Sequence, residues 1–443
     1  MTPTVVRRKP DFPEPTTSAP RVWRPAILAL ACSAILIGLS REWGLHLLER
    51  GQRIGIGAPP LAGRFARVGM TRALPAGLVA ALVVFGRRFT RSWSWRAVLT
   101  CVFLVSGAWA VALARVDGIQ AFVGPLRRGQ YFQTAHGIHG VGDFLTHFVD
   151  RITSYSVHTQ GHPPGMSLVL WLMDRLGLGS LRWNAALVVA GGAAAGVAAL
   201  VALREVAGEA SARVAAPFVV LAPAAIWWSS GDAFFAGVSA WAVTFVVLAT
   251  GRDGKDADRL ALFGGLLFGI TAFLSYGLIL LAVIPIAVAV ARRRIRPLVL
   301  AAIGATPVFV AFRVAGFSWI AGLEATRTRY FAGIARTRPY SYFLVANLAA
   351  FVCALGPAAA VALAWLRDNR VWLLVGGAFT VVALADLSGM SKAEVERIWL
   401  PFVPWVMLAT AAFATRRSRE TSWWLGLQAA GAVVIELTVR SPW

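Results

Sequence analysis

The chain has 443 residues, of which 58% are hydrophobic and 14% are charged, and its formal net charge is +22. The charges gather in short arginine-rich segments between long apolar stretches, whereas a soluble domain spreads its charge over a wet surface. The pattern argues against a soluble protein and predicts an all-α polytopic membrane protein whose first partner is the lipid bilayer. The net charge does not indicate a nucleic-acid partner, because basic residues anchor the cytoplasmic loops of membrane proteins.

The first predicted element is a basic, proline-rich tail at 1–24, which we expect to be disordered and cytoplasmic. A single membrane domain, 25–438, follows. A crossing helix needs roughly 20 apolar residues. Stretches near that length predict about thirteen spans: 25–40, 73–86, 97–114, 184–203, 214–230, 232–250, 259–273, 274–290, 297–313, 341–365, 371–387, 398–415 and 422–438. Residues 439–443 are predicted to form a short outer C-terminus.

The arginine clusters at 87–96, 291–296 and 415–421 assign the two sides of the membrane. Basic residues prefer cytoplasmic loops, so these clusters predict a multi-pass plasma-membrane protein with a cytoplasmic N-terminus. The segments 41–72, 115–164, 314–340 and 388–397 then lie outside. The apolar stretch 165–177 is too short to cross, so we interpret it as a juxtamembrane helix on the outer face. This interpretation places Asp232 on the same side as the 115–164 loop.

The outer loop 115–164 carries most of the candidate chemistry. Five of the six histidines and three acids, Asp117, Asp143 and Asp150, lie in it. Connecting loops this long are usually functional or disordered, and the loop has too many apolar residues for disorder. In Gly161-His162-Pro163-Pro164-Gly165 the prolines fix the backbone just before the short helix. His162 is therefore either held for binding or simply exposed at a stiff helix start.

A metal site and helix caps are the simpler alternatives for these residues. His158 and His162 are spaced i,i+4, which can bind Zn²⁺ on a helix, but the two prolines argue against such a helix. We assign no metal ligands and no cofactor, and a divalent metal stays open. Asp232, which precedes an apolar span, could be a helix cap, and Asp117 could be a turn carboxylate.

Cations are unusually frequent in two outer segments. Segment 314–340 holds four arginines after a single acid, Glu324: Arg327, Arg329, Arg336 and Arg338. Arginine binds phosphate bidentately, although attraction to anionic headgroups is an equal alternative. Arg397, in Arg397-Ile-Trp-Leu-Pro-Phe-Val-Pro404, could bind an anion or snorkel to the interface.

The order of Asp117, His162-Pro163-Pro164 and Asp232 resembles the GT-C superfamily of membrane glycosyltransferases, especially the protein O-mannosyltransferase and aminoarabinose transferase branches. The resemblance covers the layout of about residues 97–415 and includes the proline-rich entry at Arg397. Two spans precede Asp117 where the family usually has one, and the family's acidic pair is absent, because Gly118 follows Asp117. Asp143 and Asp150 are therefore alternative bases. The Arg-, Ala- and Gly-rich composition is similar to that of high-GC actinobacteria.

The resemblance implies transfer of a sugar from a polyprenyl-phosphate donor to a glycan, lipid or protein acceptor on the outer face. It implies catalytic roles for Asp117, as base, and for Asp232. It also implies that seven side chains bind the donor: His158, His162, Arg327, Arg329, Arg336, Arg338 and Arg397. The alternative is a transporter or lipid flippase, which usually has mid-bilayer ionisable groups and repeats. The sequence shows no internal repeat, and Asp386 and Glu436 lie toward predicted outer ends.

Overall fold

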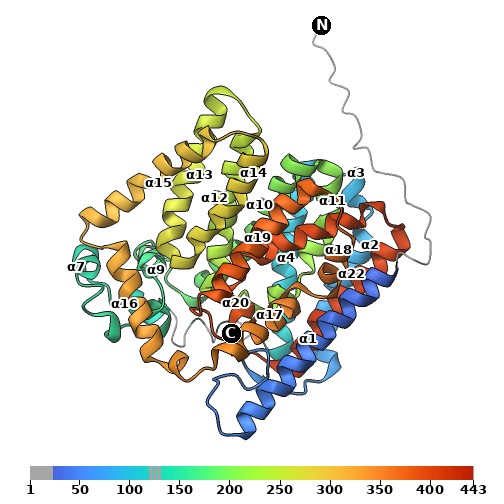
Figure 1. Ribbon diagram of the computed structural model, residues 1–443, viewed down its shortest axis with the longest axis horizontal. Coiled ribbons are helices and arrows are strands. Elements are labelled where there is room, and N and C mark those ends of the chain that lie inside the picture. Colours follow the sequence, from blue (N-terminus) through green and yellow to red (C-terminus); the bar gives the residue numbers. More distant parts are fainter. Residues whose placement is uncertain (1–22, 119–122, 124–125, 127–130, 443) are drawn as a thin grey trace.

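A computed structural model describes residues 23–118, 123, 126 and 131–442, and within these residues the chain is almost entirely helical (Figure 1). The first half contains, with η marking 3₁₀ helices, α1 (Trp23–Glu49), β1 (Arg64–Phe65), η2 (Met70–Ala73), α2 (Leu74–Gly86), α3 (Phe89–Ser92), α4 (Trp95–Asp117), α6 (Tyr131–His136), α7 (Val141–Thr146), η3 (Ile152–Ser154), α8 (Val157–Gln160), α9 (Gly165–Arg175), α10 (Leu181–Ala207), α11 (Glu209–Val220) and η4 (Pro223–Trp227).

The second half contains α12 (Gly231–Thr250), α13 (Gly254–Leu274), η5 (Tyr276–Ala282), α14 (Val283–Ala291), α15 (Arg296–Val314), α16 (Trp319–Ala332), η6 (Ile334–Arg336), α17 (Tyr340–Leu355), α18 (Pro357–Trp365), α19 (Asn369–Leu387), α20 (Val395–Ile398), α21 (Val403–Met407), η7 (Leu408–Thr415), α22 (Ser418–Thr438) and β2 (Val439–Arg440). The two short strands pair antiparallel, with Arg64 opposite Arg440.

Within the described residues, seven helices are long and apolar enough to cross a membrane: α1, α4, α10, α12, α13, α15 and α19. The bent pair α17–α18 raises this number to eight if it counts as one span. The predicted all-α class and the apolar helices of a membrane protein are therefore confirmed. The count of thirteen stays a prediction, because the other candidates form shorter or broken helices. The predicted tail at 1–24 lies outside the described residues except for Trp23 and Arg24, which begin α1.

Proline and glycine explain why some predicted spans are not single straight helices. The stretch 341–365 bends by 96° between α17 and α18. At the bend, Gly356 has a φ of +81°, which favours glycine, and Pro357 then starts α18. The stretch 214–230 is divided in a similar way, because η4 begins at Pro223 after α11 has ended.

Small residues bring the long helices into close contact. A Cβ added at Gly191 of α10 would meet the backbone of α12, and one at Gly237 of α12 would meet Gly191 in return. Gly265 of α13 and Gly304 of α15 show the same relation to each other's helices. Because lipid offers no hydrophobic drive between helices, such close backbone packing is a main source of association in membranes. These pairs form the frame on which the loops sit.

The loops form two groups, and hydrogen bonds join loops of the same group. Hydrogen bonds join Arg213 to the Thr90 carbonyl and Arg292 to Glu205, all in segments predicted to be cytoplasmic. In segments predicted to lie outside, Arg338 bonds Ile54 and Arg329 bonds Gln160. Figure 1 shows α3 and α11 in the upper part of the molecule and α7, α16 and α20 in the lower part. The grouping is the one the predicted topology requires, and the assignment of one end to the cytoplasm stays a prediction.

Candidate active site

The turn that carries His158 and His162 is fixed by its backbone. Helix α8 is four residues long and ends at Gln160, so the two histidines do not share a continuing helix. The Nδ1 atom of His162 lies 2.9 Å from the carbonyl oxygen of His158. Gly165, which begins α9, faces the backbone of Phe273 so closely that a Cβ atom would collide with it. The turn is thereby held between α8 and α13.

An aromatic cluster surrounds the two histidine rings. Tyr131, which is 2% exposed, has ring-centroid distances of 5.9 Å to His158, 5.6 Å to His162 and 6.0 Å to Phe235. His162 in turn lies 5.6 Å from the Phe235 ring. Burial raises the pKa of the Tyr131 phenol well above its ordinary value, with the negative charge of Asp232 acting in the same direction. Tyr131 therefore enters this cluster as a neutral hydroxyl group.

The centre of the site is a buried ion pair between Asp232 and Arg397. An Nη1 atom of Arg397 donates to Oδ2 of Asp232 at 2.6 Å, and each side chain is 6% exposed. Asp232 lies in the first turn of α12, where the helix dipole favours a negative charge. Arg397 lies on the short helix α20. Removing one partner of such a pair leaves a buried charge without compensation, which is strongly destabilising.

His162 lies within the electrostatic range of this pair. Burial lowers the pKa of His162 below its usual value of 6.5, and the Arg397 charge acts in the same direction. Asp232 and the His158 carbonyl oppose this shift but do not reverse it. The imidazole is consequently neutral at pH 7, and can bind a ligand as a hydrogen-bonding group.

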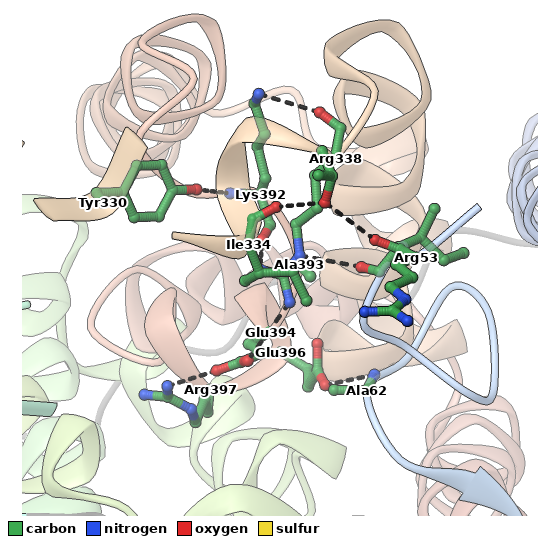
Figure 2. Close-up of polar contacts among 12 residues, drawn as sticks. Arg53, Ala62, Tyr330, Ile334, Arg338, Lys392, Ala393, Glu394, Glu396 and Arg397 are labelled. Carbon is green, nitrogen blue, oxygen red and sulfur yellow. Dashed lines mark hydrogen bonds and ion pairs between the residues drawn. The ribbon is translucent and has the colours of Figure 1, made fainter. Parts of the chain in front are cut away.

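Glu394 extends the charge network to Arg338, as Figure 2 shows. An Oε2 atom of Glu394 accepts from Arg397 at 2.6 Å, and its Oε1 atom lies 3.9 Å from Arg338. Ala393 and Glu394 have φ angles of +73° and +63°, a left-handed conformation that non-glycine residues rarely adopt. Strained backbone of this kind clusters at functional sites. The Glu394 carboxylate on this segment lies between two guanidinium groups.

Arg338 and Lys392 tie the neighbouring segments together. Arg338 is 7% exposed and its Nε–H donates to the Ile54 carbonyl at 2.9 Å. The ammonium group of Lys392 donates to the carbonyl oxygens of Ala335 and Arg338 at 3.0 and 3.1 Å. The backbone N–H of Lys392 donates to the Tyr330 hydroxyl at 2.8 Å (Figure 2). Residues 330–338 and 392–396 are therefore joined and together support Arg397.

Glu396 connects this support to the segment that follows α1. Its Oε1 atom accepts the backbone N–H of Ala62 at 2.8 Å, and the side chain is buried (Figure 2). Burial, reinforced by the charge of Glu394, raises the pKa of Glu396 to about 7, although the Ala62 hydrogen bond and Arg397 oppose the shift. A buried carboxyl group two residues from Glu394 is thus sensitive to protonation near neutral pH.

The remaining arginines of 314–340 take different positions. Arg329 donates through Nε to Oε1 of Gln160 at 2.7 Å, which joins α16 to the histidine turn. Thr326 of the same helix donates to the Gln160 carbonyl at 3.3 Å. Arg327 and Arg336 are exposed. Arg329 and Arg338 are therefore built into the structure around the site, whereas the other two arginines lie at its surface.

Asp117 lies in a second charged cluster. It is the last residue of α4, its side chain is 10% exposed, and its Oδ2 atom is 3.9 Å from Nε of Arg440. Arg64 and Arg72 also contribute positive charge near it, and Glu436 is a neighbouring acid. These groups differ from those around Asp232. An acidic neighbour for Asp117 thus comes from α22 and not from the adjacent sequence position.

The two alternative bases lie on the surface of the outer loop. Asp143 is paired with Arg151 at 2.6 Å and with His147 at 2.9 Å. The Arg151 hydrogen bond lowers the pKa of Asp143 below its usual value. Asp150 is exposed. Neither acid is enclosed with the histidine turn.

The structure therefore brings together five of the candidates, and it attaches Arg329 to the same turn through Gln160: His158, His162, Asp232, Arg338 and Arg397. Glu394 and Tyr131 also belong to the site, although neither is among the residues that the sequence predicts for it. The spacing of Glu394 and Arg397, i and i+3, was the available signal for their pairing. Within the described ranges, no group of three or more His, Cys, Asp or Glu side chains is placed to hold a metal ion.

Comparisons of the chain with protein-family models, curated proteins and solved structures found no match. The resemblance to GT-C glycosyltransferases therefore stays a prediction.

Proposed function

We propose that this protein is an integral membrane glycosyltransferase that moves a sugar from a polyprenyl-phosphate donor to an acceptor at the outer face of the plasma membrane. The observation that carries the proposal is the buried Asp232–Arg397 pair beside the His158–His162 turn. Three sequence motifs that are far apart in the chain meet there. Asp117, the first residue of the ordered set that resembles GT-C enzymes, lies instead in the charged cluster with Arg440.

The network is suited to binding a phosphate group. One Nη atom of Arg397 donates to Asp232 and the other donates to Glu394. The Glu394 carboxylate also lies near Arg338. Guanidinium groups are matched to phosphate oxygens, and fixed cations stabilise charge that develops on a leaving group. A neutral His162 and the Tyr131 hydroxyl offer hydrogen bonds to a sugar or phosphate. Asp232, held by Arg397, acts in this scheme as a positioning residue for the guanidinium.

The proposed reaction is a single displacement. A carboxylate, a role that the resemblance assigns to Asp117, takes the proton of the acceptor hydroxyl, and the acceptor oxygen attacks the anomeric carbon opposite the phosphate. The bond between that carbon and the phosphate oxygen breaks, and its electron pair leaves with polyprenyl phosphate. The configuration at the anomeric carbon is inverted. Arg440, whose Nε lies 3.9 Å from Oδ2 of Asp117, adds positive charge beside this carboxylate. A base of this kind contributes about 10²–10⁴-fold to the rate.

The proposal is tested with the full chain purified and reconstituted in proteoliposomes with radiolabelled polyprenyl-phosphate sugars. We expect a glycosylated acceptor from the wild type, a severe loss in Asp232→Asn and Arg397→Gln, and full activity in Asp143→Asn. Asp143→Asn is the matched control. Like Asp232, Asp143 is paired with an arginine, but this pair is exposed on the 115–164 loop. Movement of lipid or solute across the vesicle, with no glycosyl product, would instead identify a transporter or flippase.

A further inference from the structure

A large cavity lies among loops that are predicted to be cytoplasmic, at the end of the molecule opposite to the candidate active site. Its volume is about 770 Å³. It is lined by the start of α1, the α10–α11 connection, the loop between α18 and α19, and the end of η7 with Arg416. Four segments distant in sequence therefore line one space. Nothing in the proposed transfer reaction uses it.

Three arginines and one aspartate give this cavity a positive charge: Arg367, Arg370, Arg416 and Asp368. Asp368 is occupied, because it accepts from Arg370 at 2.8 and 3.1 Å. Arg367 donates to the carbonyl oxygens of Ala364 and Leu366, which are neutral. Two of the three positive charges are thus not matched by the aspartate in the cavity wall.

Arg416 is held in place but is not fully satisfied. Its guanidinium carbon lies 3.9 Å from the centre of the Trp365 ring, a cation–π arrangement. Its Nε atom is buried and has no hydrogen-bond partner among the residues that the structure describes. Burial lowers the pKa of Arg416, while Glu420 acts in the opposite direction. A buried donor without a partner is costly, so an acceptor that enters the cavity is favoured.

We propose that this cavity, lined by Arg367, Arg416 and Trp365, binds a phosphate group at the cytoplasmic face. Phosphate oxygens match the fork of a guanidinium, which distinguishes this ligand from a simple halide. The apolar side of the cavity, with Trp365, Leu366 and Val371, suits the uncharged part of the same ligand. The phosphate belongs either to an anionic phospholipid, abundant at the cytoplasmic leaflet, or to a soluble phosphate compound.

The test measures ligand-dependent thermal stability of the full chain after delipidation in detergent. One arm titrates sodium pyrophosphate, and the other titrates short-chain phosphatidylglycerol with phosphatidylcholine as the zwitterionic control. Arg416→Gln and Arg367→Gln remove the two cations that are not paired with Asp368. Arg259→Gln is the matched control, because Arg259 is 77% exposed, lies in a segment predicted on the same side and loses the same charge.

We expect saturable stabilisation of the wild type by at least one probe. The apparent affinity should weaken by about tenfold or more in each cavity variant, since a charge-assisted hydrogen bond is lost, and stay unchanged in Arg259→Gln. Saturation by pyrophosphate identifies a soluble ligand, and response to phosphatidylglycerol alone identifies a lipid. Arg367 is exposed, so its variant keeps the test valid if Arg416→Gln does not fold. The proposal is overturned if neither probe stabilises the wild type or if both variants bind as the wild type does.

Discussion

The Asp232–Arg397 pair predicts a measurable thermodynamic coupling between α12 and α20. Each side chain is 6% exposed and the two are joined at 2.6 Å, so either charge alone would be buried without its partner. Breaking a buried pair from one side costs about 3–5 kcal/mol. Because Arg397 also retains Glu394, we expect the lower end of this range, about 3 kcal/mol, for Asp232→Asn.

A double-mutant cycle isolates this interaction. The free energy of unfolding is measured for wild type, Asp232→Asn, Arg397→Gln and the double variant in mixed micelles. We expect the double variant to be less destabilised than the sum of the single variants, with a coupling energy of about 1–3 kcal/mol. The exposed pair Asp143–Arg151 is the control, for which surface ion pairs predict a coupling of at most about 1 kcal/mol. Additive effects of Asp232 and Arg397, within about 0.5 kcal/mol, would refute the reasoning.

Three further predictions concern catalysis, pH and the histidine turn. Asp117→Asn should lower sugar transfer by about 10²–10⁴-fold with normal expression and membrane insertion, and retained activity would remove Asp117 as the base. Because the pKa of Glu396 is raised to about 7 from an ordinary 4.5, its protonation stabilises the fold at low pH. That stability, up to about 3 kcal/mol, is lost as pH rises from 4.5 through 7, and Glu396→Gln should abolish this slope in unfolding titrations. Gly165→Ala should destabilise the protein by about 1–3 kcal/mol, because its Cβ would strike the backbone of Phe273. Gly161→Ala should not destabilise the protein, because a Cβ atom at Gly161 would lie 3.7 Å from its nearest neighbour, the His158 carbonyl oxygen. Equal melting temperatures for the two variants would contradict this account.

The sequence supported the helical class and the proximity of the histidine turn to Asp232, for a physical reason in each case. Apolar runs of crossing length are a local signal, and the count of crossings decides which loops share a face. The pairing of Asp232 with Arg397 joins residues 165 positions apart, and only a resemblance of layout pointed to it. The bend at Gly356 depends on how the chain packs near Gln428, which local hydropathy does not report.

Asp117 shows most directly which contacts cannot be predicted from the sequence. Its neighbours Arg440 and Glu436 come from the last residues of the chain, and Arg64 and Arg72 come from the segment after α1. No spacing in the sequence relates these positions. The sequence therefore identified a candidate acid but not the charged cluster that holds it.

The stoichiometry of the reaction in proteoliposomes tests the proposed glycosyltransferase most directly. Purified wild-type protein, given a doubly labelled polyprenyl-phosphate sugar, should release one polyprenyl phosphate for each sugar that appears on the acceptor, with inverted anomeric configuration. Arg397→Gln should release neither product. Donor lipid that changes leaflet while its sugar–phosphate bond stays intact would contradict the proposal.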